Sequence, residues 1–275
     1  MTVVAMTREM GSLGKDVAAG LAERLGLKVV HHELIEHHLA ERLGAPESTV
    51  HRFLEGDASL FERWKIDSKR LSRYTAEEIL DLAAQGGVVI RGWGAPSLLR
   101  PIRHVLRVRV CAPMELRVER LMARLDIGDA RLARREIERS DAAHASMMQH
   151  FFGTGWERPE LYDLVLNTER VSVAACVEQL QQLVQRPEFQ ETENSKAVLQ
   201  DNLVEARIRS ALAKLFGAGA GRDLVDVRVG SGTAVLSGFL SDPATIKQAV
   251  GIAHGVKGVT RVESNILLFP TDRAI

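Results

Sequence analysis

The sequence has few cysteines and no excess of either charge. Its two cysteines, Cys111 and Cys176, are far apart and lie in apolar surroundings. We therefore expect two buried free thiols, and the cysteine pattern does not require an oxidising compartment. The 275 residues include 36 basic and 36 acidic side chains, so the net charge is zero. Proteins that mainly bind nucleic acid carry clusters or an excess of basic residues, so nucleic acid is not expected as a partner.

Long apolar runs are missing as well. No run approaches the ~20 residues that a membrane-spanning helix needs, so no transmembrane segment is expected. The first apolar run, VVAM at residues 3–6, is too short for the hydrophobic region of a secretory signal, and Arg8 and Glu9 follow it at once. These features favour a cytoplasmic location.

Short apolar runs alternate with amphipathic stretches in the first two thirds of the chain. The runs are VVAM (3–6), VVIRG (88–92), VLRVRVCA (105–112) and DLVLNT (163–168). The stretch that follows the third run has helical spacing, and its apolar face consists of Met114, Val118, Leu121 and Leu125. The alternation predicts an α/β fold with a parallel sheet flanked by helices.

The pattern changes after a polar stretch at residues 187–198, which contains Pro187 and has no clear periodicity. We interpret this stretch as a linker between a first domain at residues 1–186 and a second at 199–270. The second domain shows helical spacing at 203–216, two alternating runs around the turn GSG (230–232), a helix that Asp242 would cap, and a last strand at 259–269. The order αββαβ indicates a small α+β domain.

The stretch TREMGSLGKD, residues 7–16, resembles an incomplete phosphate-binding loop. A full P-loop reads G-x-x-x-x-G-K-[ST], but Glu9 stands where the first glycine should be, and Asp16 replaces the Ser or Thr that holds Mg²⁺. A strand followed by glycines and a helix N-terminus suits phosphate, and Lys15 adds a positive charge. By the motif letters alone, a simple strand–helix turn with Asp16 as helix cap is equally supported.

Four longer segments resemble the cytidylate kinase-like family. MTREMGSLGKDVAAGLAERLGLKVVHHELI follows its pattern of a strand, S-R-E-[YF]-G-S-G-G-[RK]-x-I-A, a helix and [FY]-x-D-[KR]-E-[LI]. The others are VVIRGWGAPSLLR, VLRVRVCAPMELRVERL and SDAAHASMMQHFFGTGWERPELYDLVLNTERVSV. Together they cover residues 1 to about 185. In that family the first glycine is absent and the Ser or Thr is often absent, so Glu9 and Asp16 agree with the family's own loop.

The resemblance implies a P-loop kinase-like fold and a function. It implies a nucleoside monophosphate kinase that transfers the γ-phosphoryl group of ATP to CMP or a related acceptor, with Mg²⁺. The nucleotide-binding candidates are Gly11, Ser12, Leu13, Gly14, Lys15, Asp16 and Asn167, with Asp16 also the metal candidate. The catalytic candidates are Lys15 and, in a lid with Gly128 as hinge, Arg131, Arg135 and Arg139. The acceptor-side candidates are Arg8, His31, Arg91 and Asp141. The interleaved glutamates also allow the lid arginines to be an ordinary solvated, salt-bridged helix.

The sequence departs from the family at three places. Trp93 replaces the arginine of the family's G-R-G-A, His31 replaces the aspartate before E-L-I, and no Arg or Lys follows Asp141 closely, where only His144 and His150 are available. Each change removes a group that would bind phosphate or nucleoside. The alternatives are therefore a catalytically weak or inactive nucleotide-binding sensor or scaffold, or an interaction protein in which the kinase fold is structural.

The C-terminal segments VRVGSGTAVLSGFL and IAHGVKGVTRVESNILL resemble the BON domain, over residues 199–269. The family pattern is matched by Gly232, Val235, Leu236, Gly238, Gly255, Val256, Val259, Val262, Asn265 and Ile266. The resemblance implies a binding or regulatory module for an unidentified ligand, either a lipid or a protein partner.

Overall fold

The computed structural model describes residues 1–30, 39–42, 46, 48, 68–92, 94–126, 128–216 and 225–269. Its contacts divide the chain into two compact units. The first consists of Met1–Ile66 and Gln85–Thr192, and the second of Asp67–Ala84 and Glu193–Ile275. Helix α5, Ser68–Gln85, therefore groups almost entirely with the second unit, although it precedes a strand of the first.

The first unit contains a parallel sheet with the strand order β2-β3-β1-β4-β5. The strands are β1 Val3–Arg8, β2 Lys28–Val30, β3 Val88–Arg91, β4 Val105–Cys111 and β5 Leu164–Asn167. The sequence patterns predicted all of them except β2, which has only three residues and starts at the exposed Lys28. Because β1 lies between β3 and β4, its carboxyl end is at the centre of the sheet, where open α/β sheets bind their ligands.

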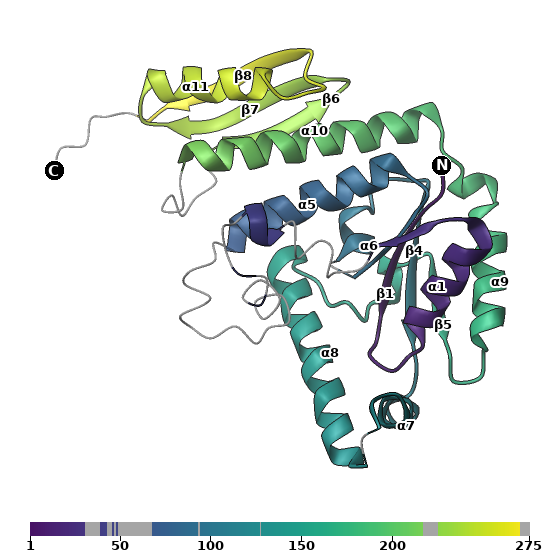
Figure 1. The fold of residues 1–275 in the computed structure, drawn as a ribbon. Helices are drawn as coiled ribbons and strands as arrows, with labels where there is room; N and C mark the ends of the chain where they lie inside the picture. The colour runs from purple at the N-terminus through teal and green to yellow at the C-terminus, as the bar shows by residue number, and fades with distance from the viewer. Residues whose placement is uncertain are drawn as a thin grey trace. The chain divides into compact units, whose positions relative to one another are not determined.

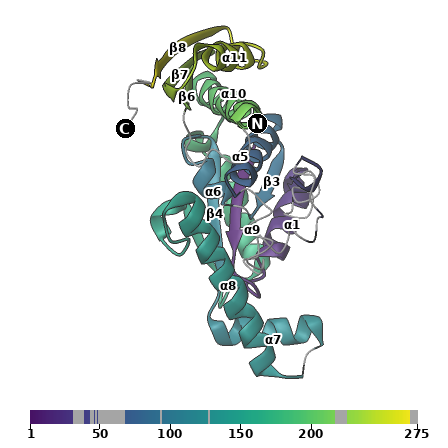
Figure 2. The same ribbon diagram turned by 90° about the vertical axis from the view of Figure 1, so that its left-hand side faces the viewer.

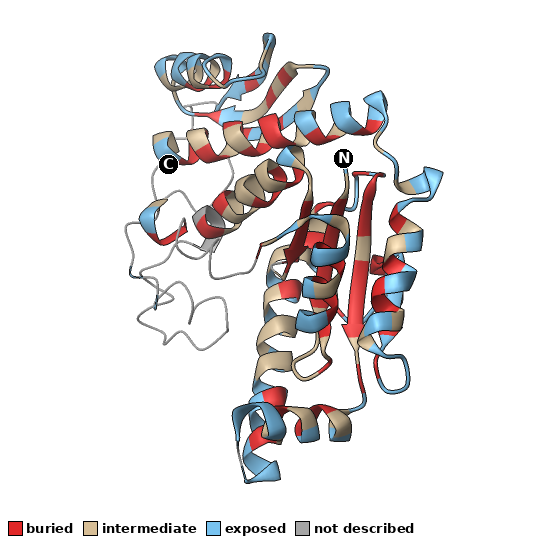
Figure 3. Ribbon diagram, turned by 45° about the vertical axis from the view of Figure 1, so that its right-hand side comes forward, coloured by how far each residue is buried: buried red, intermediate tan, exposed pale blue. Residues whose placement is uncertain are grey.

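Helices α1, Gly14–Leu25, and α9, Val173–Val184, cover one face of this sheet (Figure 1). Alternate residues of β1, Val4 and Met6, belong to the same buried cluster as Leu21 of α1 and Leu180 of α9. Buried residues continue along the strands in Figure 3, and the short helix α6, Ala95–Leu98, packs against β1. This packing fixes the junction at which β1 ends and α1 begins.

Helix α1 begins at Gly14, two residues earlier than Asp16. Its N-cap is Leu13, which has the left-handed angles φ 60° and ψ 13° and no side-chain cap bond. Asp16 lies inside the first turn, so the interpretation of Asp16 as the helix cap is wrong, because the tight turn at Leu13 already starts the helix. The helix ends at Leu25, and Gly26 follows in the left-handed conformation, as the glycine predicted.

Helices α7, Met114–Leu125, and α8, Ala130–Phe152, pack against each other, cross in Figure 2, and include the expected lid. Val118 and Leu121 of α7 pack against Ala133 and Ile137 of α8. Two expectations about α7 need correction. Leu125 lies beyond the packed turns and is 51% exposed. Arg117 lies outside the predicted apolar face, yet it is only 4% exposed because ion partners surround its side chain.

The second unit has the expected order αββαβ. Its elements are α10 Glu193–Phe216, β6 Val225–Gly230, β7 Thr233–Leu240, α11 Pro243–His254 and β8 Arg261–Leu268. Strands β6 and β7 are antiparallel, and β7 and β8 are parallel. The β6–β7 turn has positive φ at Ser231 and Gly232, as a two-residue hairpin turn requires.

Two helices of this unit begin differently. Asp242 caps α11, since its carboxylate accepts hydrogen bonds from the amides of Ala244 and Thr245. Helix α10 begins at Glu193, inside the segment 187–198 that we expected as a linker, and Ser195 and Leu199 on it are buried. The polar sequence hid this part of the helix because few of its residues are apolar.

Both cysteines are free thiols, as expected. Burial raises the pKa of each thiol above its ordinary value. Only Cys176 is fully buried, however, because Cys111 is the last residue of β4 and is partly exposed there. Among the residues that the structure describes, no helix has the length and apolar character to cross a membrane.

Candidate functional site

The loop between β1 and α1 forms the centre of the candidate site. The amide of Ser12 donates to the carbonyl of Glu9 at 3.1 Å, and the amides of Asp16 and Val17 both donate to the carbonyl of Leu13 at 3.0 Å. Within the described part of the chain, the amides of Gly14 and Lys15 meet no acceptor, and the Lys15 side chain is exposed. The loop therefore presents unpaired N–H groups and a cation at a helix N-terminus, an arrangement whose charge and geometry suit an anion.

Two glycines of this loop allow close packing around it. Gly11 has φ +78°, and a Cβ there would lie 2.6 Å from the carbonyl oxygen of Arg117 on α7. At Gly14 a Cβ would lie 2.6 Å from Cβ of Arg8, the last residue of β1. Any larger residue would thus push the loop away from α7 or from its own strand.

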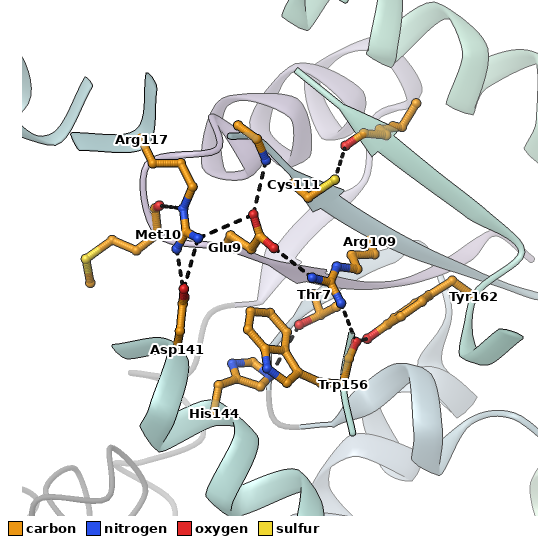
Figure 4. A network of polar contacts seen from close by, with 12 residues as sticks. Thr7, Glu9, Met10, Arg109, Cys111, Arg117, Asp141, His144, Trp156 and Tyr162 are labelled. Carbon is orange, nitrogen blue, oxygen red and sulfur yellow. Dashed lines mark hydrogen bonds and ion pairs between the residues drawn. The ribbon is translucent and has the colours of Figure 1, made fainter. Parts of the chain in front are cut away.

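Glu9, at the position of the missing first glycine, holds the loop to its neighbours (Figure 4). Its Oε1 accepts a hydrogen bond from Nη2 of Arg109 on β4 at 2.7 Å, and its Oε2 accepts one from the amide of Ala112 at 3.1 Å. Nη1 of Arg117 lies 3.5 Å from the same Oε2. Because Glu9 is only 12% exposed and both arginines less, this carboxylate is a buried anchor and cannot face a bound phosphate.

Arg117 connects the loop to α8. Its Nε donates to the carbonyl of Met10 at 2.7 Å, and its two terminal nitrogens donate to the carboxylate of Asp141 at 2.9 and 2.7 Å. The structure thus brings Asp141, an acceptor-side candidate, close to the loop, but pairs it with an arginine of the same chain. This bidentate geometry is among the strongest ion-pair arrangements in proteins.

His144, near the place where the family has Arg or Lys, lies in an aromatic cluster. Its ring stacks on Trp156 with centroids 4.3 Å apart, and its Nε2 is 3.3 Å from Oγ1 of Thr7. Arg109 lies 4.6 Å from the Trp156 ring centre and donates to the Trp156 carbonyl. Burial, with the charges of Arg8 and Arg109, lowers the pKa of His144 to about 4. His144 is therefore neutral near pH 7 and supplies no positive charge for phosphate.

The lid arginines Arg131, Arg135 and Arg139 lie one helical turn apart on α8 and are exposed. Arg139 lies 3.8 Å from Glu136. Among the described residues, no hydrogen bond or ion pair joins the side chain of Arg131 or Arg135 to the loop. The catalytic role of the three lid arginines stays a prediction.

The remaining candidates lie at the ends of strands. Arg8 and Arg91 end the neighbouring strands β1 and β3. Asn167 ends β5, is exposed, and uses its Oδ1 to accept the Glu169 amide at 2.9 Å. Its neighbour Thr168 is buried and bonds to the carbonyl of Ser12 in the loop. His31 and Trp93 lie outside the described residues.

The sequence did not predict the contacts of four residues that shape the site, namely Arg109, Arg117, Arg120 and Thr168. A usable signal existed for Arg109, which interrupts an apolar strand and would need a buried counter-charge. Glu9, directly after the first strand, was an available acidic partner. Arg120 and Thr168 lie 48 residues apart in the sequence, and no local pattern links them.

The donor set also bears on Mg²⁺. Among the described residues, no three or more His, Cys, Asp or Glu side chains converge as a metal site. Mg²⁺ is commonly held by one or two carboxylates together with substrate phosphates and water. Asp16, an exposed carboxylate next to Lys15 in the first turn of α1, fits that arrangement.

Comparisons with known proteins agree with this geometry. Residues 3–170 match the model of the cytidylate kinase-like family, and residues 200–268 match the BON domain. The cytidylate kinase of Pyrobaculum aerophilum is 27% identical over 177 residues, which cover 64% of this chain and 89% of that protein. The cytidylate kinase of Natronomonas pharaonis is 29% identical over 180 residues, 64% of this chain and 87% of that protein.

A solved structure shows the same fold. An uncharacterized protein from Eubacterium ventriosum superposes with a TM-score of 0.54 at 17% identity, covering 68% of this chain and all of that one (100%). At this identity the likeness concerns the fold alone. The two family-model matches, and not this structure, confirm both family resemblances seen in the sequence.

Proposed function

Because the chain belongs to the cytidylate kinase-like family through residues 3–170, we propose that it transfers the γ-phosphoryl group of ATP to CMP or a related nucleoside monophosphate. One observation carries the proposal. The loop at the carboxyl end of the central strand presents the unpaired amides of Gly14 and Lys15 together with the exposed Lys15 ammonium. These groups match the negative charge of a triphosphate.

In this proposal the loop holds the donor. The amides of the first turn of α1 bind the β-phosphate oxygens, and Lys15 reaches the β- and γ-phosphates. Asp16 would hold Mg²⁺ together with the phosphates, and that ion would neutralise part of their charge. Glu9 takes no part in the chemistry, because its carboxylate is used by Arg109 and Arg117.

The acceptor binds on the side of β3. Arg8 and Arg91, at the ends of neighbouring strands, are the cations proposed for its phosphate. That phosphate is already ionised at neutral pH and attacks without a general base, so catalysis depends on alignment and charge stabilisation. Closure of α7 and α8 would carry Arg131, Arg135 and Arg139 toward the transferred group.

The test is nucleotide-dependent thermal stabilisation combined with a coupled assay of phosphoryl transfer. We expect stabilisation by ATP and by CMP, stronger stabilisation by a bisubstrate analogue that joins the two, and formation of CDP. If none of the three ligands raises the unfolding temperature, the proposed nucleotide site is wrong.

A nucleotide-binding sensor is the second candidate, and two observations favour it. Asp141 is held by Arg117, and the neutral His144 stands where the family has a cation. In this case the chain binds nucleotide, transfers phosphate weakly or not at all, and acts through the BON unit on a lipid or protein partner. Binding of ATP without CDP formation would select this candidate.

A further inference from the structure

Thr168 links the end of the sheet to the phosphate-binding loop through hydrogen bonds of its amide and its hydroxyl. It follows β5, is only 2% exposed, and its amide donates to the carbonyl of Cys111 at the end of β4 at 3.0 Å. Its hydroxyl donates to the carbonyl of Ser12 at 2.8 Å. A residue that ends the sheet thus contacts the middle of the phosphate-binding loop, 156 positions earlier in the chain.

Arg120 of α7 completes this arrangement. Its Nη1 donates to the Thr168 hydroxyl at 2.9 Å, and its Nη2 donates to the Thr168 carbonyl at 2.8 Å. The hydroxyl therefore accepts from the guanidinium and has one proton to donate, for which the Ser12 carbonyl at 2.8 Å is the nearer acceptor and the Cys111 carbonyl at 3.4 Å the more distant one. Because both guanidinium bonds end on one residue, Arg120 fixes the orientation of Thr168 as well as its position.

The loop has little else that holds Ser12. The Ser12 side chain is buried, but its hydroxyl has no hydrogen-bond partner among the described residues. The Ser12 amide belongs to the Gly11–Ser12 peptide and the Ser12 carbonyl to the Ser12–Leu13 peptide, so their two bonds fix the peptide groups on either side of Ser12. Leu13 follows in a left-handed conformation that a non-glycine residue adopts at a cost. A shift of the Ser12–Leu13 peptide would displace Leu13 and, through it, the first turn of α1 that carries the amides of Gly14 and Lys15.

We propose that Thr168, oriented by Arg120, is a positioning residue that holds the Ser12 carbonyl and so keeps the amides of the loop aimed at the bound phosphates. Its effect on nucleotide affinity rests on the proposed kinase function. Its effect on the loop itself does not, and can be measured without any ligand.

The test uses Thr168→Val, which keeps the shape of the side chain but removes the hydroxyl, and Thr168→Ser, which restores it. Hydrogen–deuterium exchange is followed at the amides of Ser12, Asp16 and Val17, whose bonds close the loop. With the carbonyl bond lost, we expect these amides to exchange about tenfold faster in Thr168→Val, and ATP to bind about tenfold more weakly. Thr168→Ser should return the exchange rates and the ATP affinity to within about twofold of the wild-type values, a difference smaller than the loss of one hydrogen bond would cause.

Thr75→Val is the matched control. The Thr75 hydroxyl also bonds to a carbonyl, that of Leu71 at 2.8 Å, but on helix α5. It should leave exchange in the loop unchanged. If Thr168→Val fails to fold, Arg120→Gln tests the same link by removing the two guanidinium bonds, and should also speed exchange at these amides.

The outcomes separate the two proposals. If a folded Thr168→Val exchanges these amides at the wild-type rate, the positioning role is overturned, whether or not the chain binds ATP. If only Arg120→Gln folds, a wild-type rate in that variant overturns the role in the same way. Equal loss of protection across the whole first unit would also overturn it, because that result describes general destabilisation. If the wild-type chain does not bind ATP, the kinase proposal fails while the exchange data still decide the role of Thr168.

Discussion

The carboxylate of Glu9 lies 2.7 Å from Nη2 of Arg109, and the two side chains are 12% and 8% exposed. The residue that replaces the first glycine of the phosphate-binding motif is thus an ion partner that is mostly buried beneath the loop. Loss of one member of a buried ion pair leaves the other charge without compensation, which is strongly destabilising. The position of Glu9 is therefore explained by the stability of the loop and not by contact with a ligand.

Glu9→Gly, which would restore the usual first glycine of the motif, should weaken the protein. We expect the free energy of unfolding of the first unit to fall by roughly 3 kcal/mol, because Arg109 and Arg117 lose a shared buried partner. Chemical denaturation of the variant and the wild-type chain measures this difference. ATP affinity of the folded variant should not improve.

Glu23→Gly serves as the control, since Glu23 is exposed on α1 and its replacement removes no buried charge. It should cost only about 1 kcal/mol, the helix penalty of glycine. Equal stability of Glu9→Gly and the wild-type chain would contradict the anchoring role of Glu9.

The stability of the first unit should depend on His144 at acidic pH. The pKa of His144 is lowered from 6.5 to about 4 in the folded chain, so between these values only the unfolded chain binds the proton. The contribution of His144 to the free energy of unfolding should therefore be highest above pH 6.5, decrease as the pH falls toward 4, and level off below it. The decrease should be on the order of 3 kcal/mol, since each pKa unit corresponds to about 1.4 kcal/mol.

His144→Phe keeps an aromatic ring next to Trp156 and removes the titrating group. Denaturation at several pH values should give a flatter profile for this variant between pH 6.5 and 4. Parallel profiles for the variant and the wild-type chain would show that His144 does not cause the change.

The sequence predicted the layers of the fold well because its helices and most strands have clear periodicity. Strand β2 was missed because three residues beginning with the exposed Lys28 carry no pattern. The site was predicted less completely. Lys15 and the loop glycines are contiguous, whereas the contacts of Arg109, Arg117 and Thr168 join strands and helices that are distant in the sequence.

Lys15→Ala should weaken ATP binding without unfolding the chain. The ammonium group is exposed at the first turn of α1, so its loss leaves the core intact but removes a charged bond to phosphate, which should reduce affinity about tenfold or more. Isothermal titration with ATP measures the loss, and Lys28→Ala on the exposed end of β2 is the control. Unchanged ATP affinity in Lys15→Ala would refute the assignment of the loop.

The lid arginines should affect activity without affecting stability. Arg135 is exposed on α8, so Arg135→Ala should change the free energy of unfolding by no more than about 0.5 kcal/mol. If the lid closes over the phosphates, the rate of phosphoryl transfer by Arg135→Ala should fall at least about tenfold, because this variant lacks one cation at the transferred group.

Arg24→Ala, at an exposed position in the last turn of α1, should leave the transfer rate unchanged. If Arg135→Ala and Arg24→Ala transfer the phosphoryl group at the same rate, Arg135 has no role in the reaction. The salt-bridged helix would then be the correct interpretation of this arginine.

The proposed function is tested most directly by following the γ-phosphoryl group of labelled ATP in the presence of CMP and Mg²⁺, with the wild-type chain and Lys15→Ala side by side. The account predicts that the wild-type chain forms labelled CDP and an equal amount of unlabelled ADP, and that Lys15→Ala forms much less of both at the same ATP concentration. Saturable binding of ATP with no labelled CDP, or equal CDP formation by both chains, would contradict it.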